Sequence, residues 1–234
     1  MKAREFSKWL RERRDPQKAI GQARFFQVLP GGYAENDQFM GLTVPTIREG
    51  VKLFRGIAPQ EAVELVVSPW HEERLAGLLV WVDGFARARS DSTRGEIADL
   101  YLEHKAHVNN WDLVDSSAHF IVGPWWESHP APKVFAKLVA SPVLWDRRIA
   151  VISTFHGIRN GRPSDCWEVC EALLNDPHDL IHKATGWMLR EAGKRDLDLL
   201  REFLRLHSHR MPRTMLRYSL EKLDAVERRE WMAS

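Results

Sequence analysis

The sequence has few of the features that hold together or anchor small secreted and membrane proteins. Only two of its 234 residues are cysteines, Cys166 and Cys170. So few cysteines exclude a disulfide framework. Their four-residue spacing places both thiols on one face of a helix, half-buried in a reducing compartment. A zinc site would need further ligands at short spacing, and the sequence offers none.

Long apolar runs and a signal peptide are also missing. No stretch reaches the ~18–20 apolar residues needed to cross a bilayer. Residues 1–14 are charged throughout and lack the apolar core of a signal peptide. We therefore expect a cytoplasmic protein with no membrane partner.

Neither sign of charge dominates the chain. There are 34 Lys and Arg residues against 32 Asp and Glu residues, which gives a net charge of +2. This balance alone does not indicate a nucleic-acid-binding protein. The distribution decides, because 34 basic residues can still gather on one surface.

The common catalytic motifs are absent. The sequence contains no nucleophile-elbow serine, no phosphate-binding glycine loop and no dinucleotide fingerprint. His178 and His182 are four residues apart but do not form a His-Glu-x-x-His pattern. We expect neither a metal site nor a cofactor.

Helical periodicity is what the chain has throughout. Apolar residues recur with spacings of three and four in segments such as 75–82, 149–155 and 180–188, and alternating strands are absent. Hydrophobic residues make up 44% and charged residues 28%, as in a folded protein. The sequence therefore predicts an all-α fold.

The breaks between the helices are periodic. Pro142, Pro177 and Pro212 lie 35 residues apart, and Pro69 precedes Pro142 by 73 residues. Helix-pair repeats of ~35–45 residues are typical of HEAT-like α-solenoids. The sequence predicts such a solenoid over residues 1–234 as a single domain, with residues 31–37 forming a loop inside its N-terminal region.

Basic residues follow each periodic proline by five or six positions. If these unit starts share the concave side of the array, they line a positive trough that could follow a DNA backbone without reading its sequence. The C-terminal run adds more positive charge. The basic residues concerned are Arg74, Arg147, Arg148, Lys183, Arg210, Arg213 and Arg217.

One expected helix, residues 182–194, combines cations with a large ring. Lys183, Trp187, Arg190 and Lys194 form one stripe along it. The stripe has two interpretations: a core edge covered by solvated cations, or a phosphate-tracking surface with a stacking ring.

A second expected helix runs from Trp145 to Arg159. It places Arg148 near its start, where the helix dipole disfavours a cation, which indicates an anionic partner. That partner is either a protein carboxylate or a phosphate.

The segment 109–118 contains the pair with most chemical promise. On a helix, Trp111 and Asp115 lie one turn apart on the same face. An indole face beside a carboxylate suits a site that stabilises positive charge. The same pair also occurs on purely structural helices.

Three separated motifs resemble the AlkD-type DNA alkylation repair glycosylases. They are 110–115 (NWDLVD), 145–150 (WDRRIA) and 183–191 (KATGWMLRE), with further similarity from 41–45 (GLTVP) to 211–218 (MPRTMLRY). The resemblance covers most of the chain in the same order. It implies a basic concave face that holds duplex DNA, and hydrolysis of the N-glycosidic bond of N3- and N7-alkylated purines.

The resemblance also implies roles for individual residues. The family's catalytic aspartate corresponds to Asp115, its two site tryptophans to Trp111 and Trp187, and its phosphate-contacting arginine to Arg148. Phe25 stands where relatives often have a tyrosine, so this position allows a ring contact with DNA but no hydrogen bond from a hydroxyl. We expect a monofunctional, monomeric enzyme that binds duplex DNA containing alkylated bases.

Two alternatives remain at the level of the sequence. The chain is either a non-catalytic binder of damaged or distorted DNA, or a HEAT-type scaffold for a protein partner.

Overall fold

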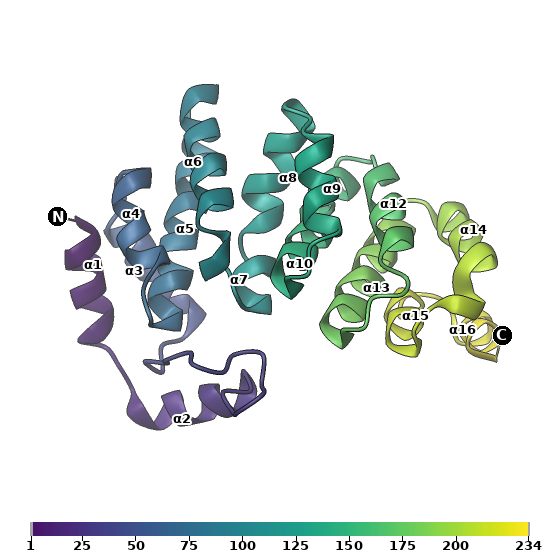
Figure 1. The fold of residues 1–234 in the computed structure, drawn as a ribbon, viewed down its shortest axis with the longest axis horizontal. Helices are drawn as coiled ribbons and strands as arrows, with labels where there is room; N and C mark the ends of the chain where they lie inside the picture. Colours follow the sequence, from purple (N-terminus) through teal and green to yellow (C-terminus); the bar gives the residue numbers. More distant parts are fainter. Residues whose placement is uncertain (1, 234) are drawn as a thin grey trace. The chain divides into compact units, whose positions relative to one another are not determined.

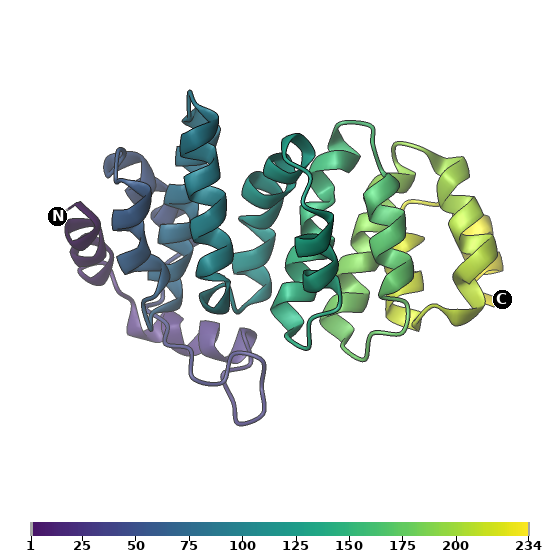
Figure 2. The ribbon, with the colours of Figure 1, turned by 45° about the horizontal axis from the view of Figure 1, so that its top comes forward.

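The computed structural model describes residues 2–233 and confirms the all-α fold class (Figure 1). Within these residues, β pairing is limited to one isolated bridge between Gln38 and Trp70. Within each unit, neighbouring helices pack side by side, as in helical-repeat proteins (Figure 2). None of the described helices is both long and apolar enough to span a membrane.

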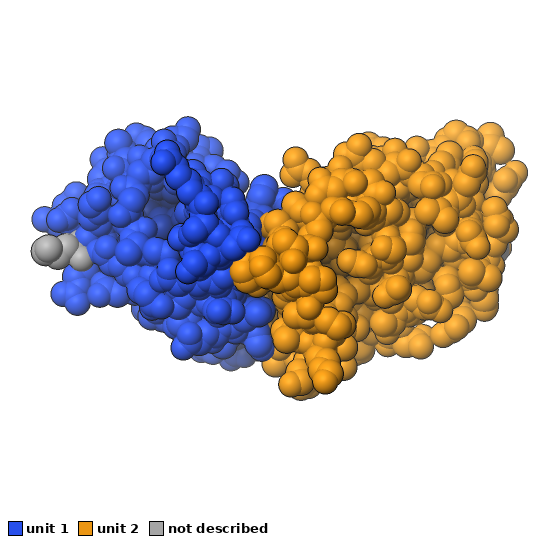
Figure 3. All heavy atoms as spheres, turned by 90° about the horizontal axis from the view of Figure 1, so that it is seen from above, with its two compact units in different colours: residues 1–121 blue, residues 122–234 orange. Residues whose placement is uncertain are grey.

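The chain forms two compact units, residues 1–121 and 122–234 (Figure 3), and the division falls within α8 (Ala118–Ser128). The basic concave face and the single domain stay predictions. Unit 1 contains α1 (Lys2–Arg11), α2 (Pro16–Phe25), α3 (Val44–Leu53), α4 (Pro59–Val66), α5 (His71–Arg87), α6 (Asp91–Glu103), η1 (Lys105–His107) and α7 (Trp111–Asp115). Unit 2 contains α9 (Pro132–Val139), α10 (Leu144–Ser153), α11 (Phe155–Arg159), α12 (Ser164–Ala172), α13 (Asp179–Gly193), α14 (Leu197–His207), η2 (Ser208–Arg210), α15 (Arg213–Ser219) and α16 (Ala225–Ala233).

The periodic prolines lie at helix starts, as the sequence predicted. Pro69, Pro142 and Pro177 each precede a helix by two residues, and Pro212 directly precedes α15. A proline here costs the helix no internal hydrogen bond, because each of the four lies before the first helical residue.

Two of these starts, one in each unit, share a motif of the form Ser-Pro-x-x-x-acid-Arg. In the first, the Ser68 hydroxyl donates to Glu73 at 2.5 Å, and Nη1 of Arg74 donates to the Ser68 carbonyl at 3.1 Å. In the second, the Ser141 hydroxyl donates to Asp146 at 2.8 Å. Nη1 of Arg147 donates to the Ser141 carbonyl at 2.8 Å. The motif therefore fastens each loop to the helix that follows it.

This motif explains part of the periodic basic pattern. Arg74 is only 4% exposed, and the Arg147 guanidinium forms a 2.5 Å ion pair with Asp176. Both arginines therefore hold loops in place, whereas the sequence interpretation placed them in a trough for DNA. Arg217, at the same distance after its proline, is exposed.

The expected helix from Trp145 to Arg159 is divided. It ends at Ser153, and α11 begins at Phe155. The Ser153 hydroxyl donates to the Ile149 carbonyl and the Thr154 hydroxyl to the Val151 carbonyl, both at 2.7 Å. Consecutive hydroxyls that take up helix carbonyls weaken or bend a helix, which accounts for the break.

The helix α2 is attached to unit 1 differently from its neighbours. It runs crosswise to α1 (Figure 1), and none of its residues is buried. The Gln22 amide donates to the Leu42 carbonyl at 2.7 Å. Gly41, at φ +85°, passes so close that a Cβ there would lie 2.0 Å from the Asp15 carbonyl oxygen. The Gln22 hydrogen bond and the close packing of the Gly41 backbone on Asp15 thus hold α2 against the loop of residues 27–43.

Candidate active site

The candidate site in unit 1 is built on α7, a helix of five residues. So short a helix is not stable alone and depends on its surroundings. Leu113 and Val114 are fully buried, and the Asn110 side chain accepts a hydrogen bond from the Trp111 N–H at 2.8 Å. Trp111 and Asp115, at the two ends of α7, are both half-buried. They occupy one helix and share the spacing that the sequence predicted.

The Trp111 ring lies within an aromatic cluster, made of Phe25, Phe26, Phe39, His71 and Trp111. Phe26 stacks on Trp111 with ring centroids 5.5 Å apart and planes 26° apart. Phe25 meets Trp111 edge-on at 5.9 Å while remaining 66% exposed. The cluster fixes the plane of the indole and leaves Phe25 open to a partner.

A hydrogen bond fixes the indole within that plane. Its Nε1–H donates to the Tyr33 hydroxyl at 3.2 Å. Tyr33 belongs to the 31–37 segment, which forms the loop that the sequence predicted. Tyr33 lies 78 residues from Trp111 in the sequence, and no local pattern connects the two residues.

Asp115 lies near a buried hydroxyl pair. The Tyr101 hydroxyl is 3.0 Å from the Ser117 hydroxyl, which donates to the Leu113 carbonyl at 2.6 Å. Burial and, secondarily, the negative charge of Asp115 raise the pKa of Tyr101. Tyr101 therefore stays protonated, and its ring forms a fully buried wall beside α7.

Four consecutive polar residues at the start of α5 are buried and hold the loops around the site. His71, Glu72 and Glu73 are each 2% exposed and Arg74 is 4% exposed. The Glu72 carboxylate accepts hydrogen bonds from the backbone N–H groups of residues 40, 41 and 42, at 2.8–3.1 Å. It thereby fixes the loop that carries Phe39.

Glu73 holds α1 instead. It accepts from the Ser7 hydroxyl at 2.6 Å and from Arg11 Nε at 2.8 Å. Burial alone would raise the pKa of Glu73, but the hydrogen bonds from Arg11 and the two serines, Ser68 and Ser7, outweigh it and lower that pKa.

His71 connects two carboxylates. Its Nε2 is 2.8 Å from Asp112 Oδ2, and its Nδ1 is 3.2 Å from Asp37 Oδ2. Burial would lower the pKa of His71, but the hydrogen bonds to Asp112 and Asp37 outweigh it and raise that pKa. Arg74 completes the group, with Nη2 at 2.7 Å from Asp37 Oδ1. Two cations thus offset two carboxylates in a buried cluster.

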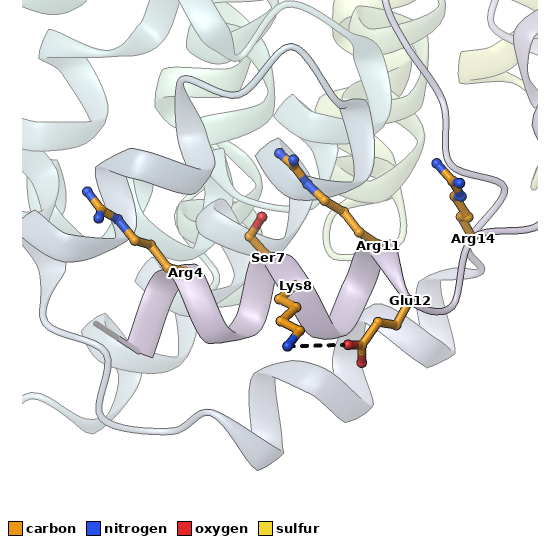
Figure 4. A pocket seen from close by; sticks show the side chains of 6 residues that line it. All are labelled: Arg4, Ser7, Lys8, Arg11, Glu12 and Arg14. Carbon is orange, nitrogen blue, oxygen red and sulfur yellow. Dashed lines mark ion pairs between the residues drawn. The ribbon is translucent and has the colours of Figure 1, made fainter.

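Unit 1 also has a basic surface, a shallow depression of about 750 Å³ along α1 (Figure 4). Three of its cations have carboxylate partners: Arg4 pairs with Glu64, Lys8 with Glu12, and Arg11 with Glu73. These carboxylates offset much of its positive charge. The depression is lined by Arg4, Ser7, Lys8, Arg11, Glu12 and Arg14.

Of the predicted stripe in unit 2, three residues lie on α13 and Lys194 directly follows it, and carboxylates accompany the cations. Lys183 pairs with Asp179 at 2.8 Å, and Glu191 accepts from Lys194 at 2.7 Å and from Arg190 at 3.1 Å. Glu221 is a further partner of Arg190. The sequence analysis had not recognised this neutralisation.

Trp187 is half-buried on α13, and its ring centroid lies 5.8 Å from that of Phe155. Arg148 is only 4% exposed, and its Nη1 donates to the Leu180 carbonyl. A protein group thus already binds the Arg148 guanidinium in this conformation.

The two arginines of α15 are more exposed than Arg148. Arg213 and Arg217 are both exposed on α15. Nη1 of Arg213 donates to the Met232 carbonyl at 2.8 Å, and the guanidinium of Arg217 lies 5.9 Å from the Tyr218 ring centroid.

Among residues 2–233, no three His, Cys, Asp or Glu side chains gather as metal ligands. Cys166 and Cys170 are free and buried, with sulfur atoms 3.8 Å apart, and burial raises the pKa of the Cys170 thiol. As predicted from their spacing, the two thiols share one helix.

Comparisons with known proteins give one family match and one similar fold. A profile of the family described as "DNA alkylation repair enzyme" matches residues 6–223. Among solved structures, a "Predicted DNA alkylation repair enzyme from Enterococcus faecalis" superposes with a TM-score of 0.71. The two chains share 17% sequence identity, and the match covers 91% of this chain and 97% of the other. A search of curated proteins found no match.

Proposed function

Because the chain belongs to the family of DNA alkylation repair enzymes, we propose that it is a monofunctional glycosylase of alkylated purines in duplex DNA. The observation that carries this proposal is the pairing of Trp111 with Asp115 at the two ends of α7. An indole ring and a carboxylate on one short helix can together stabilise positive charge at a sugar.

The reaction needs little from the protein because the lesion is itself a good leaving group. The bond between C1′ of the sugar and the purine nitrogen breaks, and its electron pair neutralises the cationic base. The sugar then carries the positive charge. Asp115 stabilises it and accepts a proton from the water that attacks C1′. Trp111 and Trp187 each add cation–π stabilisation of about 0.5–2 kcal/mol.

We assign the DNA contacts to Phe25 in unit 1 and to basic residues of unit 2. The 66% exposure of Phe25 beside Trp111 supports a ring contact with DNA. For Arg148, Lys183, Arg190 and Lys194 to bind phosphates, each has to exchange a protein partner for the phosphate, whereas Arg213 and Arg217 are exposed. Phosphate contacts of this kind fix the register of the duplex without reading its sequence.

The test is base release from a duplex containing a single N7-methylguanine. We expect the wild-type protein to release the base and Asp115→Asn to release none above background while still binding the duplex. Asp91→Asn is the matched control, because Asp91 is an exposed carboxylate on α6 whose partner is Arg94. Asp91→Asn should retain wild-type activity.

Equal release by Asp115→Asn and the wild-type protein would refute the role of Asp115. Binding of the duplex without release by the wild-type protein would make the chain a non-catalytic binder of damaged DNA. No binding at ~100 mM salt would favour a scaffold for a protein partner.

A further inference from the structure

The carboxylate next to Trp111 is held by a buried histidine. Asp112, the second residue of α7, contacts His71 at 2.8 Å, and His71 reaches Asp37 on its other side at 3.2 Å. An ionised carboxylate only accepts hydrogen bonds, and a neutral imidazole has a single N–H. With both carboxylates ionised, the two contacts are therefore satisfied together only when His71 is an imidazolium that donates from both nitrogens.

The same imidazole is part of the aromatic cluster. Its ring centroid lies 4.6 Å from Phe39 and 4.9 Å from Phe26. Phe26 in turn stacks on Trp111. His71 thus reaches α7 by two routes, through the Asp112 carboxylate and through the Phe26 ring.

A one-turn helix makes these contacts consequential. With five residues, α7 has too few internal hydrogen bonds to hold its own orientation. A small rotation of α7 moves the Trp111 ring and the Asp115 carboxylate together. Reaction rates depend steeply on such placement, because a displacement of ~1 Å costs about 100-fold.

We propose that His71, held as an imidazolium between Asp37 and Asp112, is a positioning residue that sets the orientation of Trp111 and Asp115. This inference rests on the proposed glycosylase function for its kinetic consequence, but the orientation of Trp111 can be measured without it. His71 is 2% exposed, so we expect it to act through its protein partners and not through a contact with DNA.

The kinetic test separates positioning from binding. In His71→Gln, a single amide nitrogen replaces the two ring nitrogens that face Asp37 and Asp112, and the amide oxygen cannot donate. We therefore expect single-turnover release of N7-methylguanine to slow by about 10- to 100-fold. The dissociation constant for the duplex should stay within about 3-fold, because the phosphate-binding residues are unchanged. An unchanged single-turnover rate would overturn the proposal.

The pH dependence gives a second kinetic readout. The groups facing His71 are Asp37, Asp112 and Arg74, and the two carboxylates keep it protonated to higher pH than a free histidine. Wild-type release should therefore fall at alkaline pH as the imidazolium loses its proton, and this limb should be absent in His71→Gln. Identical pH profiles would contradict the proposal.

The structural readout is the indole N–H resonance of Trp111, identified by its loss in Trp111→Phe. It should shift in His71→Gln and in Asp112→Asn, and an unmoved resonance in both variants overturns the proposal. If the wild-type protein releases no base, the glycosylase proposal fails and this resonance alone decides on positioning. Asp112→Asn preserves the shape of the side chain and so serves where His71→Gln fails to fold.

His104→Gln is the matched control. His104 is a partly buried histidine of unit 1 whose Nδ1 lies 3.0 Å from the Leu100 carbonyl. Its ring also contacts a tryptophan, Trp81, at 6.3 Å. Because no hydrogen bond connects it to α7 among the described residues, the release rate and the Trp111 resonance should both stay at wild-type values.

Discussion

At the scale of residues, some charged side chains that one would expect at the surface from the sequence are buried and hold loops and helices together. The run from His71 to Arg74 contains four charged or titratable residues in succession, and all four are buried. Besides Ser68 nearby, they have partners 34, 41 and 62 residues away: Asp37, Asp112 and Arg11. No local periodicity reveals such partners, which explains why the sequence analysis missed this group.

Glu72 provides a stability prediction at this scale. Glu72→Gln removes the charge that accepts the N–H groups of Met40, Gly41 and Leu42. Hydrogen bonds to a charged group contribute about 1.5–3 kcal/mol each, so the free energy of unfolding should fall by about 2–3 kcal/mol. Denaturant titration measures this. A loss below about 0.5 kcal/mol, as is usual for surface substitutions, would mean that the loop does not depend on Glu72.

Trp187 provides a prediction for activity. Trp187→Leu removes the electron-rich ring, and loss of about 0.5–2 kcal/mol of cation–π stabilisation should slow single-turnover base release by about 2- to 30-fold. Trp126→Leu is a close control, since Trp126 is also half-buried in unit 2 and also contacts a phenylalanine, Phe135, at 5.1 Å. Equal slowing by both substitutions would mean that the effect comes from packing.

At the scale of elements, the sequence predicted the helices and their starts better than their ends. Apolar periodicity and the spaced prolines indicate the helices correctly. The break after Ser153 was missed, because two hydroxyls that bend a helix leave the apolar pattern intact. The Trp–Asp spacing suits one helix face, and both residues do lie on the short helix α7, whose bounds the sequence did not indicate. The hydrogen bond that holds the Trp111 indole comes from Tyr33, 78 residues away, where no local pattern points to it.

The packing of α13 against α15 leads to a matched pair of glycine substitutions. At Gly186, a Cβ would lie 2.5 Å from the Met215 carbonyl oxygen and 2.6 Å from the Tyr218 Cβ. Gly186→Ala should therefore destabilise the protein by about 1–3 kcal/mol through overpacking. At Gly21, within α2, nothing lies within 4 Å, so Gly21→Ala should stabilise by about 0.5–1 kcal/mol. Thermal unfolding of both variants checks the opposite signs.

At the scale of the whole molecule, buried ion pairs give stability two pH limits. The pKa values of Asp37 and Glu73 are lowered in the folded protein, so their stabilisation is present above the unfolded pKa and lost as pH falls. The pKa of His71 is raised, so its stabilisation is complete below the unfolded value and lost as pH rises through the folded one. Stability should therefore be greatest at about pH 5–6.5.

Denaturant unfolding from pH 3 to pH 9 measures these limits. Glu73→Gln should flatten the acid limb, and His71→Gln should flatten the alkaline limb. An alkaline limb of equal steepness in His71→Gln would show that another group produces it.

The exposed arginines of α15 predict the salt dependence of DNA binding. If Arg213 and Arg217 each contact a phosphate, each substitution to Gln should lower the magnitude of the slope of log K against log salt by about 1. The affinity should fall equally for damaged and undamaged duplexes. A slope that does not change would exclude these two residues from the interface.

The attachment of α2 has a consequence for local opening. With no buried side chain of its own, α2 can separate from the rest of unit 1 while the core formed by α5 stays intact. Its backbone amides should therefore exchange with deuterium through a low-energy fluctuation, well before those of α5. Phe25 is the last residue of α2, so a bound duplex should slow this exchange. The exchange rates of the α2 amides would then report whether DNA is bound at the aromatic cluster.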